Sequence, residues 1–361
     1  MSILRRISAR IFAGAAYAVL AATGWKKKTV KANLRHVSQG TWGREVADSK
    51  IEQRNSETRL HNSGTRPRGL YRRMLKNLTR HVGEMLFCFD TYKNLPEDCG
   101  KYPYKKDGSI FEIAEGAAAV IDKMRRGGIF LTAHYGNYEA SGAWLCALGV
   151  PLKASFIPLK PEWLNRYVYE NVRCVRGRPY SIDAKTPREF LNLLDGKPEK
   201  FRGTCPKENS KSNLQKTASD EPRSNRQLFC LLADQDSRIG SALDGTFLRR
   251  PAKINPLPDF LLKHRPDTPV FFCWIEETLD PSRGVSRKIL HAVEAAKYQP
   301  EHTTSLSDAD LRQHDTQKNT CRSIVDGPYR EWLEERIREN PALWYGWTHR
   351  RFKSMNPEIY Q

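Results

Sequence analysis

The sequence IFLTAHYGNYEASGAW, residues 129–144, places a buried strand directly before a cluster of polar residues. Apolar residues at 127–133 form the short run that favours such a strand. A histidine, a glycine, an asparagine and a glutamate follow at once. In α/β folds, ligands and catalytic groups gather at the carboxyl ends of the strands. This stretch therefore predicts both a sheet and the place of a site at its edge.

Further apolar runs alternate with helical patterns along the chain. The predicted strands are 127–133, 151–159, 228–234, 269–277 and, more weakly, 286–295. The predicted helices are 109–126, 161–175 and about 322–339. Strands that alternate with helices are typical of layered α/β folds. We therefore expect an α/β fold in which helices flank a central mixed sheet.

The chain is strongly basic, and its cysteines show no pairing pattern. Its 361 residues are enough for one large domain or two modest ones. Lysines and arginines number 60 against 41 aspartates and glutamates, which gives a formal charge of +19. Such a surplus favours anionic partners: nucleic acid, anionic lipid or an acidic carrier protein. The eight cysteines include no CxxC pair, which favours a reducing compartment and argues against a zinc site.

The N-terminus carries a membrane signal. RRISARIFAGAAYAVLAATGWKKK, residues 5–28, holds an uncharged stretch from Ile11 to Trp25 between arginines and lysines. A spanning helix needs about 20 apolar residues, so this stretch is short, although basic flanks extend the span by snorkelling. A retained anchor over residues 1–28 is favoured over a cleaved signal peptide or a buried core helix, because three lysines follow at once. The flanking charges leave the topology open, and the cysteines favour a cytoplasmic body.

Between the anchor and the sheet we expect a helical and loop region, residues 29–108, packed on an α/β domain at 109–361. Residues 38–68 are polar and aperiodic, as in a connector. Residues 69–90 carry apolar side chains at helical spacing, which predicts an amphipathic helix that packs on the core more than on a membrane. Residues 196–227 are rich in Lys, Ser, Asn and Pro and almost devoid of aliphatics, which predicts a disordered surface insertion.

The polar residues after the first predicted strand suit a general base. His134 titrates near neutrality, and Glu139 is expected to fix its tautomer. Gly136 allows backbone angles that other residues resist, and Asn137 is a good helix N-cap. The free amides of that helix start would favour a developing anion. The spacing alone is weak, because this composition makes about one His-x4-acid pair expected by chance, so its placement carries the prediction.

No stronger catalytic motif competes with this histidine. The chain has no GxSxG elbow, P-loop, GxGxxG or HExxH motif. Its basic clusters lack the sheet or helix-turn-helix context of nucleic-acid-binding proteins. A general base without a covalent nucleophile favours direct transfer onto a hydroxyl or an amine. Together with a membrane anchor, this favours the acylation of a lipid.

The motif HYGNYE at 134–139 resembles the HxGNWE-type signature of the bacterial lipid A biosynthesis late acyltransferases, lauroyl and myristoyl transferases of the lysophospholipid acyltransferase superfamily. Four further stretches resemble blocks of that family in the same order: VKANLRHV at 30–37, IPLKPEWLNRYVYENVRCVRG at 157–177, LLADQDSRIGSALDGTFLRRPA at 231–252 and NPALWYGWTHRRFK at 340–353. The chain departs from the pattern at Tyr138, where tryptophan is usual. It departs again at 253–264, which keeps Pro258 but lacks the family's glycine and threonines.

The resemblance implies a glycerolphosphate-acyltransferase-like fold. It also implies transfer of a fatty acyl chain from acyl-acyl carrier protein to a hydroxyl of a lipid A precursor. His134 would be the general base and Glu139 would orient it, while helix-start amides and Arg173 would stabilise the oxyanion. The substrate-binding residues implied are Gly136, Asn137, Arg173, Asp234 and Gln235. Neither a metal nor another cofactor is required.

The resemblance further implies a place at the cell inner membrane, with the catalytic domain facing the cytoplasm. The partners would be acyl-acyl carrier protein and an anionic lipid or glycolipid acceptor, without nucleic acid. Two alternatives stay open. The first is an acyltransferase for another glycolipid or a lysophospholipid. The second is a non-catalytic basic protein that binds membranes or nucleic acid.

Structural roles also stay open for several of these residues. Asp234 and Gln235 would serve equally as a polar strand exit. Arg173 would serve as a solvated helix charge. Trp344 and Trp347 belong to an aromatic, basic tail that either closes the core or forms an interfacial belt.

Overall fold

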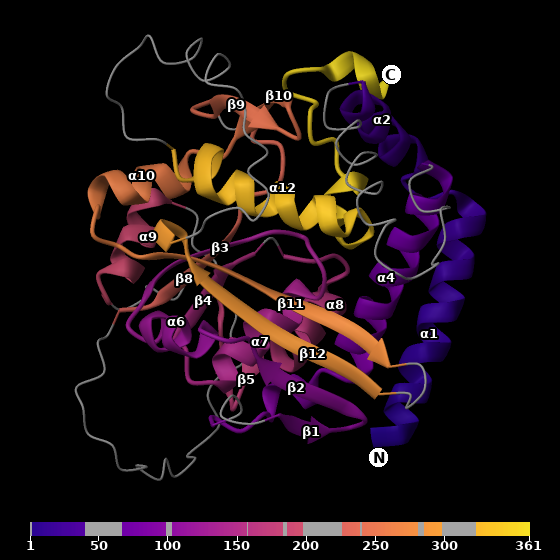
Figure 1. Ribbon diagram of the computed structural model, residues 1–361, viewed down its shortest axis with the longest axis vertical. Helices are drawn as coiled ribbons and strands as arrows, with labels where there is room; N and C mark the ends of the chain where they lie inside the picture. The colour runs from indigo at the N-terminus through magenta and orange to yellow at the C-terminus, as the bar shows by residue number, and fades with distance from the viewer. Residues whose placement is uncertain are drawn as a thin grey trace, which may run out of the picture.

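The computed structural model describes residues 2–39, 67–98, 103–156, 158–182, 186–197, 226–238, 240–280, 285–297 and 323–361. Most of the predicted insertion at 196–227 and of the predicted connector at 38–68 lies outside these residues. The described chain is an α/β fold with one large mixed sheet flanked by helices (Figure 1). The predicted fold class is confirmed at this level.

Eight strands form the central sheet in the order β1-β2-β12-β11-β3-β8-β4-β7. Their bounds are β1 Tyr104–Lys106, β2 Ser109–Ile113, β3 Gly128–Thr132, β4 Leu152–Ser155, β7 Ser181–Ile182, β8 Leu228–Leu232, β11 Val270–Asp280 and β12 Val285–Glu294. The strands from β11 to β7 in this order run parallel to one another. By contrast, β12 is antiparallel to β11 and parallel to β2. The sheet is therefore mixed, with β3 and β8 side by side.

Helices and two small hairpins surround this sheet. The helices are α1 Ser2–Thr23, α2 Lys27–Ser38, α4 Pro67–Phe87, α5 Asp90–Lys93, α6 Ala117–Met124, α7 Tyr138–Ala147, α8 Glu162–Tyr167, α9 Pro187–Leu194, α10 Leu257–His264 and α12 Arg330–Glu339. The hairpins are β5 Cys174–Val175 with β6 Arg178–Pro179, and β9 Leu243–Phe247 with β10 Arg250–Ile254. π-Helical turns lie at Val168–Val172 and Val325–Tyr329.

The side chains of β3 enter two hydrophobic cores, one on each face of the sheet. Ile129 and Leu131 pack with α9, α10 and α12, whereas Phe130 packs with α6 and α7 on the other face. Successive residues of a strand point to opposite faces, so a strand covered on both sides needs an unbroken apolar run. All five residues of β3 are buried, as the sequence predicts.

The other strands and helices match the predictions with three differences. The predicted strands at 228–234, 269–277 and 286–295 are β8, β11 and β12. The strand predicted at 151–159 ends at Ser155. The helix predicted at 161–175 is α8 followed by a π-helical turn. The helix predicted at 322–339 likewise begins with a π-helical turn before α12.

The helix predicted at 109–126 is wrong over its first part. Ser109–Ile113 is β2, which pairs with both β1 and β12, and α6 begins only at Ala117. Phe111 is buried in the core, while its neighbours are only partly covered. Gly116 precedes α6 with a φ of 75°, which separates the strand from the helix. β1 and β2 form one hairpin, so the predicted boundary between 108 and 109 falls in its turn.

α1 and α4 form an antiparallel pair beside the sheet (Figure 1). A Cβ at Gly83 of α4 would lie 2.7 Å from the carbonyl oxygen of Ala9, so glycine allows the two helices to approach this closely. The Tyr71 hydroxyl donates to the carbonyl oxygen of Trp25 at 2.8 Å. The predicted amphipathic helix at 69–90 is confirmed as α4, and it packs on the core through Leu70, Met74 and Leu75.

The N-terminal helix exposes apolar side chains. Ile3, Leu4, Ile7, Ile11 and Val19 are each at least 46% exposed. Among the described residues, no single helix is long and apolar enough to cross a membrane alone. Residues 3–23 and 27–38 reach that length and composition only together, as a pair bent by 75°.

Candidate active site

The candidate site lies where β3 and β8 end. The two strands are parallel, and their register pairs Thr132 with Leu232. Two residues further on, each chain places a polar side chain at the same level: His134 after β3 and Asp234 after β8. The carboxyl ends of neighbouring parallel strands share one edge of a sheet, which is where α/β folds bind ligands. The fold therefore brings together two residues that are 100 positions apart.

Asp234 holds both the ring and the backbone of His134. Its Oδ1 is 2.9 Å from His134 Nδ1, and its Oδ2 accepts a hydrogen bond from the His134 backbone N–H at 3.1 Å. Trp344 Nε1 donates to the same Oδ2 at 2.9 Å. A carboxylate only accepts hydrogen bonds, so the neutral imidazole carries its proton on Nδ1. Nε2 is then left as the nitrogen that can take a proton.

The charges of this pair shift both pKa values. Burial opposes ionisation of Asp234, but attraction to His134 and hydrogen bonds from His134 and Trp344 outweigh it and hold its pKa at about 2. Burial also lowers the pKa of His134, yet the adjacent carboxylate outweighs this effect and raises it above the usual value. Asp234 is therefore an anion at neutral pH, and it stabilises a protonated His134.

Glu139 does not orient the imidazole, contrary to the prediction. It forms an ion pair with Arg173, with Arg173 Nε at 3.2 Å from Oε2 and Nη2 at 2.5 Å from Oε1. Both side chains are at least 84% buried, and the Glu139 carboxylate helps to raise the pKa of Arg173 against the effect of burial. Arg173 follows the π-helical turn and brings its guanidinium alongside α7, which gives Glu139 a closer partner than His134.

Arg173 is therefore not a solvated helix charge. Two of its guanidinium nitrogens bind Glu139, and its planar group also lies 5.2 Å from the ring centroid of Phe156. A bidentate arginine–carboxylate pair fixes geometry as well as charge. The pair ties the segment after α8 to the first turn of α7, next to His134.

The turn between β3 and α7 matches the prediction at Gly136 and differs at Asn137. Gly136 has a φ of 57°, the left-handed conformation expected of a glycine there. Its N–H donates to the carbonyl oxygen of Leu343. Asn137 occupies the N-cap position of α7, but its side chain does not cap the helix. Its Nδ2 donates instead to Glu84 Oε2 at 3.0 Å and approaches the Tyr92 hydroxyl at 3.4 Å.

Three side chains surround the exposed edge of His134. Gln235 Nε2 lies 3.4 Å from His134 Nε2, so this predicted residue is in place to touch a group bound there. The sequence did not predict the other two. The rings of Tyr138 and His349 lie 5.2 Å and 5.6 Å from the His134 ring. Burial and the nearby charge of His134 lower the pKa of His349, which favours its neutral form.

The C-terminal tail closes over the site. Tyr345 N–H donates to the carbonyl oxygen of His134 at 2.7 Å, and Tyr135 forms an isolated β-bridge with Trp344. Trp344 and Trp347 are fully buried. Of the two interpretations left open, the structure supports a tail that closes the core. The tail also contacts Asp234 through the Trp344 side chain, whose Nε1 donates to the carboxylate.

Distant parts of the sequence meet at this tail. Asn33 of α2 is fully buried, and its Nδ2 donates to the carbonyl oxygens of Trp347 and His349 at 2.9 Å and 2.8 Å. A buried side-chain amide with two backbone partners holds the tail in one place. Asn33 therefore connects α2 to the part of the tail that places His349 beside His134.

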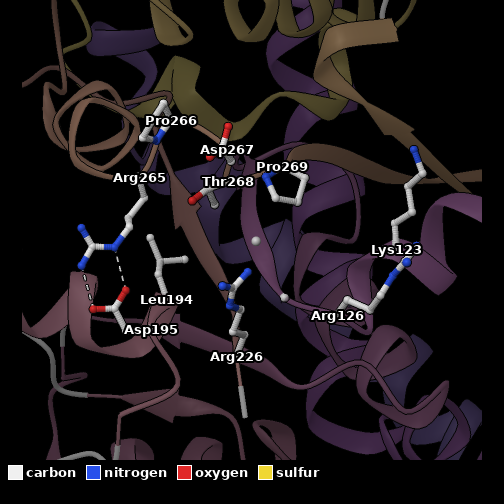
Figure 2. A pocket seen from close by; sticks show the side chains of 12 residues that line it. Lys123, Arg126, Leu194, Asp195, Arg226, Arg265, Pro266, Asp267, Thr268 and Pro269 are labelled. Atoms are coloured by element: carbon white, nitrogen blue, oxygen red, sulfur yellow. Dashed lines mark hydrogen bonds and ion pairs between the residues drawn. The ribbon is translucent and has the colours of Figure 1, made fainter. Parts of the chain in front are cut away.

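A separate cavity of about 370 Å³ lies at the opposite ends of these strands (Figure 2). Its basic lining is partly neutralised: Arg265 makes a bidentate pair with Asp195 at 2.7 Å and 2.8 Å, and Lys123 pairs with Glu294. Gly128, the first residue of β3, lines it, so this cavity and His134 lie at opposite ends of one strand. It holds none of the predicted site residues.

Among the described residues, no group of three or more His, Cys, Asp or Glu side chains is arranged to hold a metal ion. The site consists instead of one imidazole that is oriented by a buried carboxylate, beside a helix start with a free first turn. This arrangement can move a proton at Nε2 and stabilise a nearby anion.

No family model matches this chain, and no curated protein shows significant similarity to it. The likeness to the late acyltransferases therefore rests on the quoted motifs.

Proposed function

We propose that the chain is a membrane-associated O-acyltransferase. It would move a fatty acyl group from acyl-acyl carrier protein to a hydroxyl of a lipid A precursor at the cytoplasmic face of the cell inner membrane. One observation carries the proposal: Asp234 fixes the Nδ1 proton of His134 at the carboxyl ends of β3 and β8, so that Nε2, next to the Gln235 amide, is the nitrogen that can take a proton. A general base needs this arrangement to take a proton from a bound hydroxyl.

The meeting of separate sequence blocks supports the family resemblance. Four blocks outside the 134–139 motif contact it or its direct partners. Asn33 binds the tail at His349, and Arg173 binds Glu139. Asp234 binds His134 directly, and Trp344 binds Asp234. Motifs that are scattered over more than 300 residues but converge on one histidine favour a shared chemical role.

The proposed reaction has two proton transfers. His134 Nε2 takes the proton of the acceptor hydroxyl as its oxygen attacks the thioester carbonyl. The imidazolium that forms is stabilised by Asp234, which already raises the pKa of His134. The tetrahedral intermediate collapses with cleavage of the carbon–sulfur bond. His134 Nε2 then returns the proton to the leaving thiolate, which gives the ester, the free carrier thiol and a neutral imidazole.

The start of α7 is the proposed stabiliser of the oxyanion. Among the described residues, no acceptor binds the backbone N–H groups of Tyr138, Glu139 and Ala140; the first helical bond in α7 runs from Ser141 to Asn137. Free amides at a helix N-terminus favour negative charge. Arg173 would act indirectly here, because its guanidinium is engaged by Glu139.

The surface features fit a membrane substrate. α1 exposes Ile3, Ile7 and Ile11 on successive turns, next to basic side chains such as Arg10. Apolar side chains beside basic ones favour an anionic membrane surface. The net charge of +19 would favour an acidic carrier protein and a phosphorylated lipid alike.

Mass spectrometry of acyl transfer tests this proposal. Purified membranes that contain the full chain would receive labelled acyl-acyl carrier protein and a panel of acceptors: a tetra-acylated lipid A precursor, other glycolipids and lysophospholipids. We expect one added acyl chain on the lipid A precursor, which disappears with His134→Ala. Acyl addition to a different acceptor would show that the protein acts on that lipid instead of the lipid A precursor. No transfer by a folded protein would overturn the proposed activity and favour a basic membrane-binding protein without catalysis.

A further inference from the structure

A buried cluster of charges joins α4 to the sheet next to the site. Lys288 of β12 is 4% exposed, and its Nζ lies 2.9 Å from Glu277 Oε1 and 3.1 Å from Glu84 Oε2. Arg80 of α4 completes the cluster by binding Glu277. Burial would lower the pKa of Lys288, but the two carboxylates outweigh it and keep the pKa well above its usual value. The cluster therefore sets two basic side chains, Lys288 and Arg80, against two acidic ones, Glu277 and Glu84.

Glu84 is the member of this cluster that reaches the motif. Its Oε2 accepts a hydrogen bond from Asn137 Nδ2 at 3.0 Å as well as the one from Lys288. The Tyr92 hydroxyl lies 3.4 Å from the same Nδ2. Asn137 is 4% exposed, so its amide has little access to water as an alternative partner. Glu277, by contrast, contacts Lys288, Arg80 and His81 but not Asn137.

This contact keeps Asn137 from its ordinary role at a helix start. An asparagine at the N-cap position usually accepts hydrogen bonds from the second or third backbone N–H of the helix. Asn137 holds that position but makes no such bond, and its Nδ2 lies instead against Glu84 and Tyr92. The N–H groups of Tyr138, Glu139 and Ala140 have no acceptor among the described residues.

We propose that Glu84 is a positioning residue for the reaction proposed above. It holds the Asn137 side chain away from the first turn of α7, so that the backbone N–H groups there stay free for the oxyanion. The hydrogen bond from Lys288 holds the Glu84 carboxylate in one place. This inference rests on the proposed function for its catalytic consequence, but the position of Asn137 can be tested separately.

A matched pair of variants separates positioning from stability. Glu84→Ala and Glu277→Ala each remove one carboxylate from the same buried cluster, and Glu277→Ala should destabilise the protein at least as much, because Glu277 is more buried and pairs with Lys288, Arg80 and His81. We expect Glu84→Ala to lower kcat by about tenfold or more with KM within about twofold, because the oxyanion would lose free donors. Glu277→Ala should keep kcat within about threefold of the full protein. Glu84→Gln should recover most of kcat, because its carbonyl oxygen can still accept from Asn137.

Hydrogen exchange provides the readout that does not depend on activity. In Glu84→Ala, Asn137 is released and can cap α7, so the amides of residues 138–140 should exchange more slowly than in the full protein. Glu277→Ala should leave those amides unchanged. Mass spectrometry with fragmentation of a peptide that covers 135–146 measures this in the purified full chain.

The outcomes are distinguishable. Equal losses of kcat in Glu84→Ala and Glu277→Ala would show that the cluster acts only through stability and would overturn the inference. Unchanged exchange at 138–140 in Glu84→Ala would overturn it as well. If the unaltered protein transfers no acyl group, the proposed function fails, and slower exchange confined to Glu84→Ala would still establish that Glu84 positions Asn137.

Discussion

The imidazole of His134 and the carboxylate of Asp234 lie 2.9 Å apart although 100 residues separate them in the chain. The register of β3 and β8 produces this contact, because it places both residues two positions beyond paired strand ends. Asp234 is buried and its pKa is held at about 2, so it is ionised at neutral pH. The pair is the central feature of the site.

The stability contributed by His134 should depend on pH. Its folded pKa is raised above 6.5, so folding favours its protonated form. This contribution is complete below the unfolded pKa of about 6.5 and is lost as the pH rises through the raised folded value. Asp234 stays ionised over that range. We therefore expect the difference in melting temperature between the unaltered protein and His134→Gln to be larger at about pH 6 than at about pH 9. A difference that grows with pH would contradict the assigned sign.

The Glu139–Arg173 pair should make a large contribution to stability. Both side chains are mostly buried, so Glu139→Gln leaves a buried arginine without its charged partner. We expect a loss of about 3 kcal/mol in the free energy of unfolding. Glu139→Gln combined with Arg173→Met should recover part of it, since no unpaired charge then remains.

An exposed pair provides the control for this experiment. Arg176 and Glu97 form an ion pair in which both side chains are at least 43% exposed. Glu97→Gln should change the unfolding free energy by less than about 1 kcal/mol in denaturant titrations. Equal effects of Glu97→Gln and Glu139→Gln would show that burial does not increase the contribution of the Glu139–Arg173 pair to stability.

Trp344 should stabilise Asp234 through one hydrogen bond. Trp344→Phe keeps an aromatic ring in the core but removes the Nε1 donor to the carboxylate. We expect a cost of about 2 kcal/mol, because hydrogen bonds to charged groups are stronger than neutral ones. Trp347→Phe is the comparison, since Trp347 Nε1 donates to the neutral carbonyl of Pro341. If the second change costs as much as the first, the charge of Asp234 has no special effect.

The exposed face of α1 should bind membranes. Ile7 and Ile11 are 46% and 68% exposed, and we expect Ile7→Asp with Ile11→Asp to lower binding to anionic vesicles by at least about tenfold. Leu243→Asp, at a 40% exposed position on β9, is the control and should have little effect. Vesicle sedimentation measures the bound fraction. If salt weakens vesicle binding but the α1 substitutions do not, charge alone is responsible for the binding.

The sequence alone was enough to predict features that depend on residues adjacent in the chain. The apolar run of β3 is visible because both faces of the strand are buried. Gly136 is visible because few other residues adopt its positive φ. The error at Ser109–Ile113 has a similar local origin: five residues are too few to separate a strand from the start of a helix, and pairing with β12 decides the outcome.

The partners within the site could not be predicted in the same way. Glu139 is near His134 in sequence, but Arg173 binds it, and His134 takes Asp234 instead. Knowing that β3 and β8 are neighbouring parallel strands would have placed Asp234 beside His134, and only the sheet order supplies that fact. Glu84 carries no signal in the sequence, and His349 lies in the block at 340–353 without a predicted place at the site, because packing of α4 and of the tail brings them there.

The pH dependence of acyl transfer tests the central claim most directly. If neutral His134 is the base, kcat/KM should fall on the acid side with an apparent pKa above 6.5, because Asp234 raises the pKa of His134. Asp234→Asn removes that charge, so it should lower kcat by about a hundredfold or more and move the acid limb to lower pH. Glu139→Gln should move the limb less than Asp234→Asn does, because the Glu139 carboxylate makes a smaller contribution to the raised pKa of His134. A limb that moves with Glu139→Gln and stays in place with Asp234→Asn would contradict the account.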